Sequence, residues 1–404
     1  MEKTHQKMYV CKIITLSTLL LTLFLFTGCA RTYEPTDDPA AREELARNID
    51  RILTQDNFSG AIFIRQGEHI ILNQAYGMAD RENNIENTIH TPFGIASITK
   101  QFTGAAILLL EEQGKLDTSS TLDAFFPEHV GLGLENVTVA DLLLMRGGFG
   151  NSLGDLMEIL NSPEGLSQIA EELMDSLPEE DFELVLSTLA ASGGDFHATF
   201  VEIQTLDSVR AFMMNYLETL YMSLWGGEVL PRFNYSNTDY WMLGRVIEEV
   251  SGMTYEEFMA TNFFEPLGMV NSGFLGISES AHSYNIHGYI VPIMDIFAIP
   301  FATGGLVSSV YDLSIWLDSY FGGELFDIAR LDEIHNNVYS HGWYFRTDTV
   351  WSHPGAFNPP NFVAFTTHDR ESDTTIIILS AEDTTRLRNA MTRISQWTID
   401  FRIP

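Results

Sequence analysis

Segments with the residue pattern of β-strands lie toward both ends of this 404-residue chain, and helical segments separate them. Residues 59–67 and 68–77 are rich in β-branched and aromatic side chains and meet at a glycine turn, which predicts two neighbouring strands. From Thr303 onward, strand patterns return in GGLVSSV, WYFRTD, VWSHPG, NFVAFTTHD and TTIIILSA. This order predicts an α/β (α+β) fold in which one sheet is assembled from both ends of the chain.

The residues between these strands predict a second, mostly helical domain. Residues 150–230 have a helical and strongly acidic pattern, as in SQIAEELMDSL. We expect residues 43–115 and 285–404 to form the sheet domain, which includes a final helix at 384–399. Residues 116–284 then form the mostly helical inserted domain.

The first 28 residues have the composition of a bacterial signal peptide. Three lysines precede residues 13–26, which are apolar apart from small hydroxyl residues and are too few to span a bilayer comfortably. The following Thr27-Gly28-Cys29 resembles the lipobox of bacterial lipoproteins. Cleavage before Cys29 would make Cys29 the lipidation site and leave polar, proline-containing residues 29–42 as a tether. An uncleaved N-terminal anchor is the alternative, and both readings place the domain outside the cytoplasm, at the cell membrane or outer envelope.

The formal net charge of −33 argues against nucleic acid as a partner. Nucleic-acid binding needs clustered positive charge, and this chain has 22 basic residues against 55 acidic ones. We interpret the acidity as a solvated surface, with an acidic or salt-rich habitat as the alternative. The only cysteine besides Cys29 is Cys11, in the signal segment, so the mature chain has no internal disulfide and depends on its core.

Ser97 and Lys100 form a Ser-x-x-Lys motif at the start of an apolar segment that predicts a buried helix from about Ser97 to Gln113. Residues i and i+3 share one face of a helix, so the amine of Lys100 can reach the Ser97 hydroxyl. After the signal segment the chain has only two lysines, Lys100 and Lys115, but seventeen arginines. A desolvated lysine can lose its proton at accessible pH, whereas arginine cannot. The motif therefore indicates a serine nucleophile beside a lysine base.

Two further motifs carry groups suited to this chemistry. Tyr235-Ser236-Asn237 offers a phenol that can act as acid or base and an amide that can orient a substrate carbonyl. In His353-Pro354-Gly355, the small glycine would let a substrate backbone approach the strand closely. Pro354 lacks an N–H, which predicts an open strand edge on its side. Taken singly, these motifs are more typical of a turn and of a structural histidine.

Together, the order SxxK, YxN and HxG resembles the serine β-lactamase and penicillin-binding-protein superfamily, and most of all its class C and esterase-like branch. The resemblance extends from about Asn57 to Trp397 and includes EEQGKLDTSSTLDAFFPE, FFEPLGMVNSGF and ATGGLVSSVYDLSIWL. It implies a β-lactamase/transpeptidase-like fold with an antiparallel sheet flanked by helices.

The resemblance also implies roles for individual residues. Ser97 would attack a carbonyl and form an acyl-enzyme, while Lys100 and Tyr235 share the proton transfers, and which of them is the base stays open. Asn237 would bind the acyl side chain of the substrate. The strand at His353 and Gly355 would line the site, with the N–H groups of Ser97 and Ala356 as the oxyanion hole. We expect no metal and no cofactor, and a small-molecule or peptide substrate.

Departures from the family pattern leave the substrate open. Residues 145–148, Met-Arg-Gly-Gly, stand where relatives usually have HTSG. The leading hypothesis is an exported hydrolase of esters, amides or peptides. A true β-lactamase or D-Ala-D-Ala carboxypeptidase of the cell wall is the second hypothesis. The third is a non-catalytic lipoprotein that binds peptidoglycan or β-lactams.

Overall fold

The computed structural model describes residues 39–129, 131–149, 163–192, 199, 202–204, 206–223, 225, 227–274, 301–335, 338–356 and 362–381. Its helices are α2 (Pro39–Gln55), η1 (Ala96–Ile98), α3 (Thr99–Glu112), η2 (Leu122–Ala124), η3 (Leu134–Asn136), α4 (Val139–Leu143), α6 (Pro163–Ser176), α7 (Glu179–Ala191), α9 (Asp207–Ser223), α10 (Asn237–Ser251), α11 (Tyr255–Met259), η4 (Ala260–Phe264), α12 (Glu265–Leu267), α13 (Phe301–Gly304), α14 (Val310–Gly322) and α15 (Ile328–Ile334).

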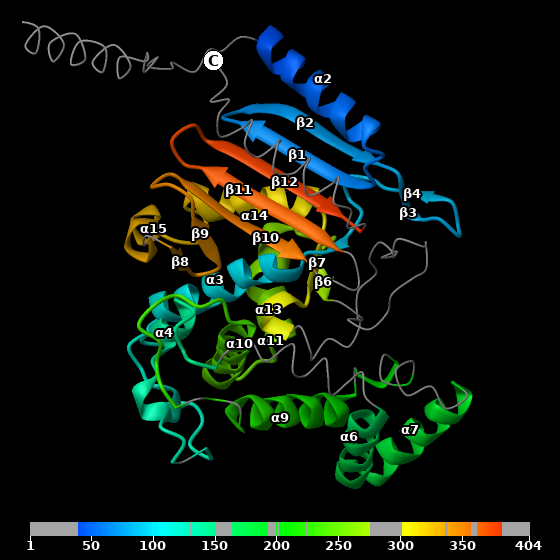
Figure 1. The fold of residues 1–404 in the computed structure, drawn as a ribbon, viewed down its shortest axis with the longest axis vertical. Helices are drawn as coiled ribbons and strands as arrows, with labels where there is room; N and C mark the ends of the chain where they lie inside the picture. Colours follow the sequence, from blue (N-terminus) through cyan, green and yellow to red (C-terminus); the bar gives the residue numbers. More distant parts are fainter. Residues whose placement is uncertain are drawn as a thin grey trace, which may run out of the picture.

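The main sheet has seven antiparallel strands in the order β2-β1-β12-β11-β10-β9-β8. These strands are β1 (Gly60–Gln66), β2 (His69–Tyr76), β8 (Tyr339–Ser340), β9 (Trp343–Phe345), β10 (Val350–Ala356), β11 (Val363–Asp369) and β12 (Thr374–Ser380). β1 and β12 are neighbours, with Ala61 opposite Leu379. The prediction of one sheet built from both chain ends is therefore confirmed (Figure 1).

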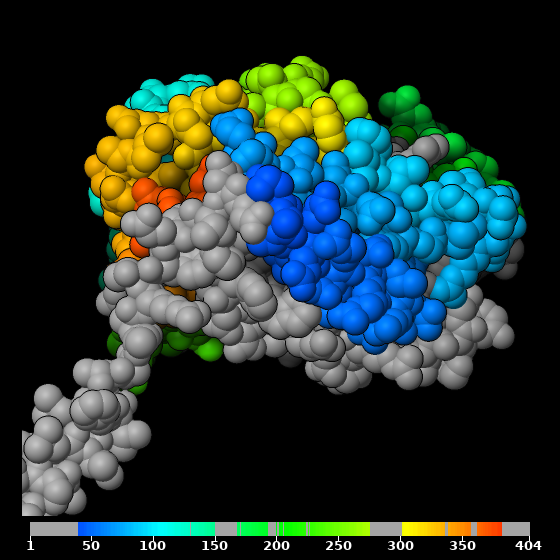
Figure 2. Space-filling view, turned by 90° about the horizontal axis from the view of Figure 1, so that it is seen from above, coloured from blue at the N-terminus to red at the C-terminus, as the bar shows by residue number. Residues whose placement is uncertain are grey.

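Alternating side chains on the central strands cover both faces of the sheet. On one face, Ile62 of β1 and Ile376 of β12 pack with Leu45 and Ile49 of α2. Figure 2 shows α2 in dark blue across the outer surface of this part of the molecule. On the other face, neighbouring residues such as Phe63 join the larger core, where α14 lies against β1 and β12. Successive side chains of a strand point to opposite faces of the sheet, so consecutive apolar residues make both faces apolar.

Two smaller sheets complete the strands. β3 (Met78–Asp80) pairs with β4 (Ile85–Glu86), and β7 (Leu306–Ser308) lies between β5 (Phe93–Gly94) and β6 (Gly273–Phe274). β5 leads directly into η1 and α3, which begins the helical layer. α3 is buried on nearly every side and contacts α10 and α13, as a helix that is apolar all round must be.

The acidic middle of the chain is helical where the structure describes it. α6, α7 and α9 lie on the opposite side of the molecule from α2 (Figure 1). In the described residues, no helix is long and apolar enough to cross a membrane. Cys29, the signal segment and the expected helix at 384–399 lie outside the described residues, and the proposed domain boundaries stay a prediction.

Candidate active site

Ser97 lies in the one-turn helix η1, between β5 and α3. The preceding residue, Ala96, is fully buried and has φ 47°, a left-handed conformation that costs a non-glycine residue roughly 1–3 kcal/mol. This turn packs against β10, because a Cβ at Gly355 would lie 2.3 Å from the Ile95 carbonyl oxygen. The chain's own backbone thus lies close against Gly355, a packing role that the sequence did not reveal, and the expected approach of a substrate backbone stays a prediction. Because Gly355 has no side chain, the turn that holds Ser97 can pack directly against the sheet.

Lys100 projects from the first turn of α3 and is fully buried. Its Nζ lies 3.1 Å from Ser97 Oγ, 2.7 Å from Asn237 Oδ1 and 2.7 Å from the Thr303 carbonyl oxygen. Burial lowers the pKa of Lys100 well below its ordinary value. In the neutral amine, two hydrogens can be donated to Asn237 and Thr303, which leaves the lone pair for the Ser97 hydroxyl.

Tyr235 lies on the other side of the Ser97 hydroxyl. Its OH donates a hydrogen bond of 2.8 Å to Ser97 Oγ, and its ring lies 5.2 Å from Lys100 Nζ. Burial raises the pKa of Tyr235 above its ordinary value, although the hydrogen bond with Ser97 opposes the shift. The phenol therefore stays protonated at neutral pH. The structure brings Ser97, Lys100 and Tyr235 together as the sequence predicted.

Asn237 is the first residue of α10, behind the N-cap Ser236, whose side chain accepts a hydrogen bond from the Asp239 N–H. Its amide oxygen accepts from Lys100 Nζ. The expected contact with an acyl side chain would therefore have to use its NH₂ group. This arrangement gives Asn237 a second task, which is to hold the amine of Lys100 beside Ser97.

His353 is buried in β10. Its Nδ1 lies 2.7 Å from the Pro354 carbonyl oxygen and its Nε2 lies 3.3 Å from the Tyr339 OH, so Nδ1 is assigned the hydrogen. Burial lowers its pKa to about 3, and positive charge on Lys100 would lower it as well. The imidazole is therefore neutral across the physiological range.

The second half of β10 has a free side toward β9, within the residues that the structure describes. β9 pairs with β10 at Trp351 and Ser352, while β11 pairs along the whole strand to Ala356. The pairing of β10 with β9 stops at Ser352, and the open strand edge predicted from Pro354 begins after that residue. Ala356 is exposed at the end of β10, as a main-chain oxyanion donor would need to be.

Sequence reasoning missed two groups that hold these residues in place. The carbonyl of Thr303, in α13, binds Lys100, and only the glycines that follow it in ATGGLVSS signalled an unusual main chain. The buried carboxyl of Asp239 accepts hydrogen bonds from the Ser236 hydroxyl and the Gly147 N–H, and burial raises its pKa to about 7. Asp239 thereby ties loop 145–148 to the Tyr-x-Asn motif, and a Cβ at Gly147 would lie 2.5 Å from Leu142 Cδ2 and 3.0 Å from Asp239 Oδ2.

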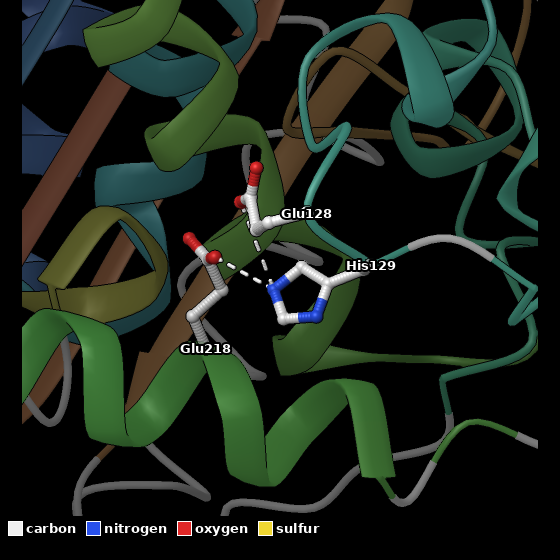
Figure 3. A group of neighbouring side chains, drawn as sticks. All are labelled: Glu128, His129 and Glu218. Carbon is white, nitrogen blue, oxygen red and sulfur yellow. Dashed lines mark hydrogen bonds and ion pairs between the residues drawn. The ribbon is translucent and has the colours of Figure 1, made fainter.

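A separate group of possible metal ligands lies away from these residues. Glu128, His129 and Glu218 converge in Figure 3, with His129 Nε2 3.0 Å from Glu218 Oε1 and 3.8 Å from Glu128 Oε1. The other oxygen of Glu218 accepts a 2.8 Å hydrogen bond from Arg245 Nε. Hydrogen bonds and ion pairs within the chain thus account for this group, which contains none of the predicted catalytic residues.

Comparisons with known proteins find relatives that span most of this chain. Residues 45–185 and 190–395 match the family model described as Beta-lactamase. PbpX of Bacillus subtilis (strain 168), whose name classes it with penicillin-binding proteins, is 23% identical over 361 residues, which cover 87% of this chain and 77% of that protein. The penicillin-binding protein from Bacillus halodurans has a similar structure, with a TM-score of 0.65, 20% identity and coverage of 86% and 98% of the two chains. The structure of a class C beta-lactamase is also similar, with a TM-score of 0.61 and 15% identity. The match covers 90% of this chain and 98% of that chain.

Proposed function

Because this chain belongs to the serine β-lactamase and penicillin-binding-protein superfamily and is a serine hydrolase, we propose that it cleaves its substrates through an acyl intermediate on Ser97. One observation carries this proposal. The Ser97 hydroxyl oxygen lies within hydrogen-bond reach of both the Lys100 amine and the Tyr235 phenol. A nucleophile with a base and a proton donor on either side is the arrangement that acyl transfer requires.

In the proposed first step, neutral Lys100 accepts the Ser97 proton as Oγ bonds to the substrate carbonyl carbon. Burial lowers the pKa of Lys100 and raises that of Tyr235, which favours Lys100 as the base and Tyr235 as the donor. Tyr235 gives its proton to the leaving group when the carbonyl re-forms and that bond breaks, and Lys100 returns a proton to Tyr235. In the second step, water attacks the carbonyl carbon of the acyl group and the same proton transfers run in reverse. The bond to Ser97 Oγ then breaks, Ser97 regains its proton and the carboxylic acid is released. The N–H groups of Ser97 and Ala356 are the proposed oxyanion donors.

The proposed substrates are esters, with amides and peptides as further members of the class. A permanent cation on the strand at position 353 would help to hold a carboxylate next to the reacting bond, but the buried imidazole of His353 is neutral. This favours ester cleavage over a true β-lactamase or a D-Ala-D-Ala carboxypeptidase. The buried Lys100, whose amine lies within hydrogen-bond distance of Ser97, Asn237 and Thr303, disfavours a purely binding lipoprotein, because a desolvated amine beside a serine is typical of a working site.

We also propose that the protein acts outside the cytoplasm, anchored by a lipid on Cys29. The proposal is supported by the basic start, the apolar run and the Thr27-Gly28-Cys29 sequence. Cys29→Ser should abolish incorporation of radiolabelled palmitate. Unchanged incorporation would contradict the anchor without affecting the catalytic proposal.

A panel of substrates tests the proposed activity. Purified protein should hydrolyse 4-nitrophenyl esters faster than a chromogenic cephalosporin or D-alanyl peptides, and Ser97→Ala should lose all of these activities. Efficient cephalosporin hydrolysis with no ester turnover would contradict the ester preference. If the protein bound these compounds but hydrolysed none of them, the proposed hydrolytic activity would be contradicted.

A further inference from the structure

We propose that Thr103 is a positioning residue for the proposed base, because its hydroxyl holds the main chain of α13 so that the Thr303 carbonyl faces the Lys100 amine. That carbonyl then stabilises the positive charge that the amine gains when it accepts a proton. The inference rests on the proposed function, since it concerns the proton that Lys100 takes up in that reaction. Thr103 acts through the carbonyl and not on the reacting atoms.

The side chains of Lys100 and Thr103 bind two successive carbonyls of α13. They lie three positions apart on α3 and therefore on one face of that helix. Thr103 Oγ1 donates to the Ala302 carbonyl at 2.6 Å, and Lys100 Nζ donates to the Thr303 carbonyl at 2.7 Å. The last carbonyls of a helix have no partner within it, and successive ones point the same way. α3 therefore supplies the partners for the end of α13.

Tyr255, the first residue of α11, restricts the direction of the Thr103 hydroxyl. Thr103 has one hydrogen to donate, and its Oγ1 lies 2.6 Å from the Ala302 carbonyl and 3.3 Å from the Thr99 carbonyl. With the hydrogen in the shorter contact, Tyr255 OH donates to Thr103 Oγ1 at 2.8 Å. These residues are fully buried, so water does not compete for the Ala302 carbonyl.

α13 needs this restraint because it begins in an unfavourable conformation. Phe301 has φ 32°, in the left-handed region that favours glycine, although it is fully buried. Its ring packs against that of Tyr255, with 4.9 Å between the ring centres. Such a conformation persists only where the surrounding structure holds it. The hydrogen bond from Thr103 to the next residue, Ala302, therefore helps to keep the Thr303 carbonyl in place.

The Thr303 carbonyl has its largest effect when Lys100 is charged. Burial lowers the pKa of Lys100 because it disfavours the ammonium form. A hydrogen bond from an ammonium group is stronger than one from a neutral amine, so the carbonyl offsets part of this effect. A carbonyl that is already in place also needs no rearrangement as the charge forms. Loss of the Thr103 hydroxyl should therefore lower both the pKa of Lys100 and the rate of acylation.

The other titratable groups around Lys100 carry no charge near neutral pH. The rings of Tyr235 and Tyr240 lie 5.2 and 5.9 Å from its Nζ, and burial raises the pKa of both phenols. Burial lowers the pKa of His353 on β10 to about 3. The buried acid of α10, Asp239, receives its hydrogen bonds from other residues. A change in the pKa of Lys100 without the Thr103 hydroxyl thus reports on the carbonyl.

The pKa of Lys100 can be measured directly, because lysine is rare in this chain. Protein labelled with ¹³C at lysine Cε has at most five lysine signals in an NMR titration, and the one missing from Lys100→Arg belongs to Lys100. Thr103→Val keeps the shape of the side chain but removes the hydroxyl. It should lower the pKa of Lys100 by about one unit and kcat/KM for 4-nitrophenyl butyrate about tenfold, as expected for one weakened hydrogen bond to a charged group.

Two further variants separate positioning from a general loss of stability. Thr103→Ser retains the hydroxyl and should keep the pKa of Lys100 at its unaltered value. Thr367→Val is the matched control, because the buried Thr367 hydroxyl also donates to a main-chain carbonyl, that of Trp351 at 3.1 Å. In the described structure that carbonyl forms no hydrogen bond with Lys100. Thr367→Val should lower the thermal stability and leave the pKa unchanged.

A second route applies if Thr103→Val does not fold. Tyr255→Phe keeps the ring against Phe301 but removes the hydrogen that Tyr255 donates to Thr103. The Thr103 hydroxyl is then free to turn toward the Thr99 carbonyl. We expect a smaller lowering of the pKa of Lys100, in the same direction.

The outcomes distinguish this inference from the proposed function. An unchanged pKa of Lys100 in Thr103→Val, or in Tyr255→Phe where Thr103→Val does not fold, would overturn the role of Thr103 and leave the hydrolase intact. An equal lowering in Thr367→Val would also overturn it. Absence of ester turnover and of fluorophosphonate labelling at Ser97 in the unaltered protein would contradict the proposed function, and the NMR titration would still show whether Thr103 sets the pKa.

Discussion

The amine nitrogen of Lys100 lies 3.1 Å from the hydroxyl oxygen of Ser97, inside a helix that is buried on nearly every side. Asn237 and the Thr303 carbonyl accept the two other hydrogen bonds of this amine. A lysine in this environment is poorly suited to carrying a charge and well placed to accept the Ser97 proton.

Replacing Lys100 by arginine tests proton transfer rather than charge. Arginine keeps a cation and much of the length but cannot release its proton at accessible pH. We expect Lys100→Arg to lower kcat/KM for 4-nitrophenyl butyrate by about a hundredfold or more, the lower end of what a positioned base contributes. Near-normal turnover by a folded variant would show that Lys100 is not the base.

The pH dependence of the reaction should follow the ionisation of Lys100. Activity needs the neutral amine, so kcat/KM should rise with pH and reach its plateau well below 10.5, because burial lowers the pKa of Lys100 from that value. Burial raises the pKa of Tyr235, so loss of the phenol proton should not end the plateau near neutrality. His353, with its pKa lowered to about 3, should not contribute above mildly acidic pH.

Asp239 supplies the control for this profile, because burial raises its pKa to about 7. The variant Asp239→Asn removes that titration while preserving the shape of the side chain. If the fall of kcat/KM toward acidic pH persists in this variant, the ionisation of Lys100 is its cause. A fall that disappears would mean that the ionisation of Asp239, rather than of Lys100, controls the rate.

His353 should determine part of the choice between esters and β-lactams. His353→Lys places a cation on β10, where it can help to hold a carboxylate next to the lactam. The ratio of cephalosporin to ester turnover should therefore rise, whereas the neutral variant His353→Gln should not raise it. An equal ratio in His353→Lys and the unaltered protein would rule out a role for charge at this position.

Gly355 should be intolerant of a side chain because the turn that holds Ser97 packs against it. In Gly355→Ala, the new Cβ would lie 2.3 Å from the Ile95 carbonyl and push the Ser97 turn off β10. Overpacking of this kind costs roughly 1–3 kcal/mol, so both thermal stability and ester turnover should fall. Gly322→Ala is the matched control, because its Cβ would meet no atom within 4 Å. Equal behaviour of the two variants would contradict the packing argument.

Much of the fold followed from local patterns. Alternating and β-branched residues predicted β1, β2 and the C-terminal strands, and short-range period-two order also placed His353 and Gly355 on one strand. The spacing of Ser97 and Lys100 predicted their contact, since residues three apart share a helix face. Bringing Tyr235 to them required the family resemblance, because 138 positions separate it from Ser97.

The remaining features depend on contacts between distant segments. A carbonyl such as that of Thr303 is present in every residue, so no residue type announces that it will bind Lys100. The sequence marks Asp239 only as an acidic residue, and the fold alone brings the Gly147 N–H to its carboxylate. The sequence does not reveal that Ile95 lies against Gly355, so the packing role of this glycine was not predicted.

The most direct test of the account is the site at which a serine-directed reagent becomes attached. A fluorophosphonate probe should modify the unaltered protein once, and mass spectrometry of the digested protein should locate the adduct on Ser97. Lys100→Arg should react far more slowly and Ser97→Ala should not react at all. Attachment to another residue, or normal ester turnover by Ser97→Ala, would contradict the assignment of Ser97 as the nucleophile.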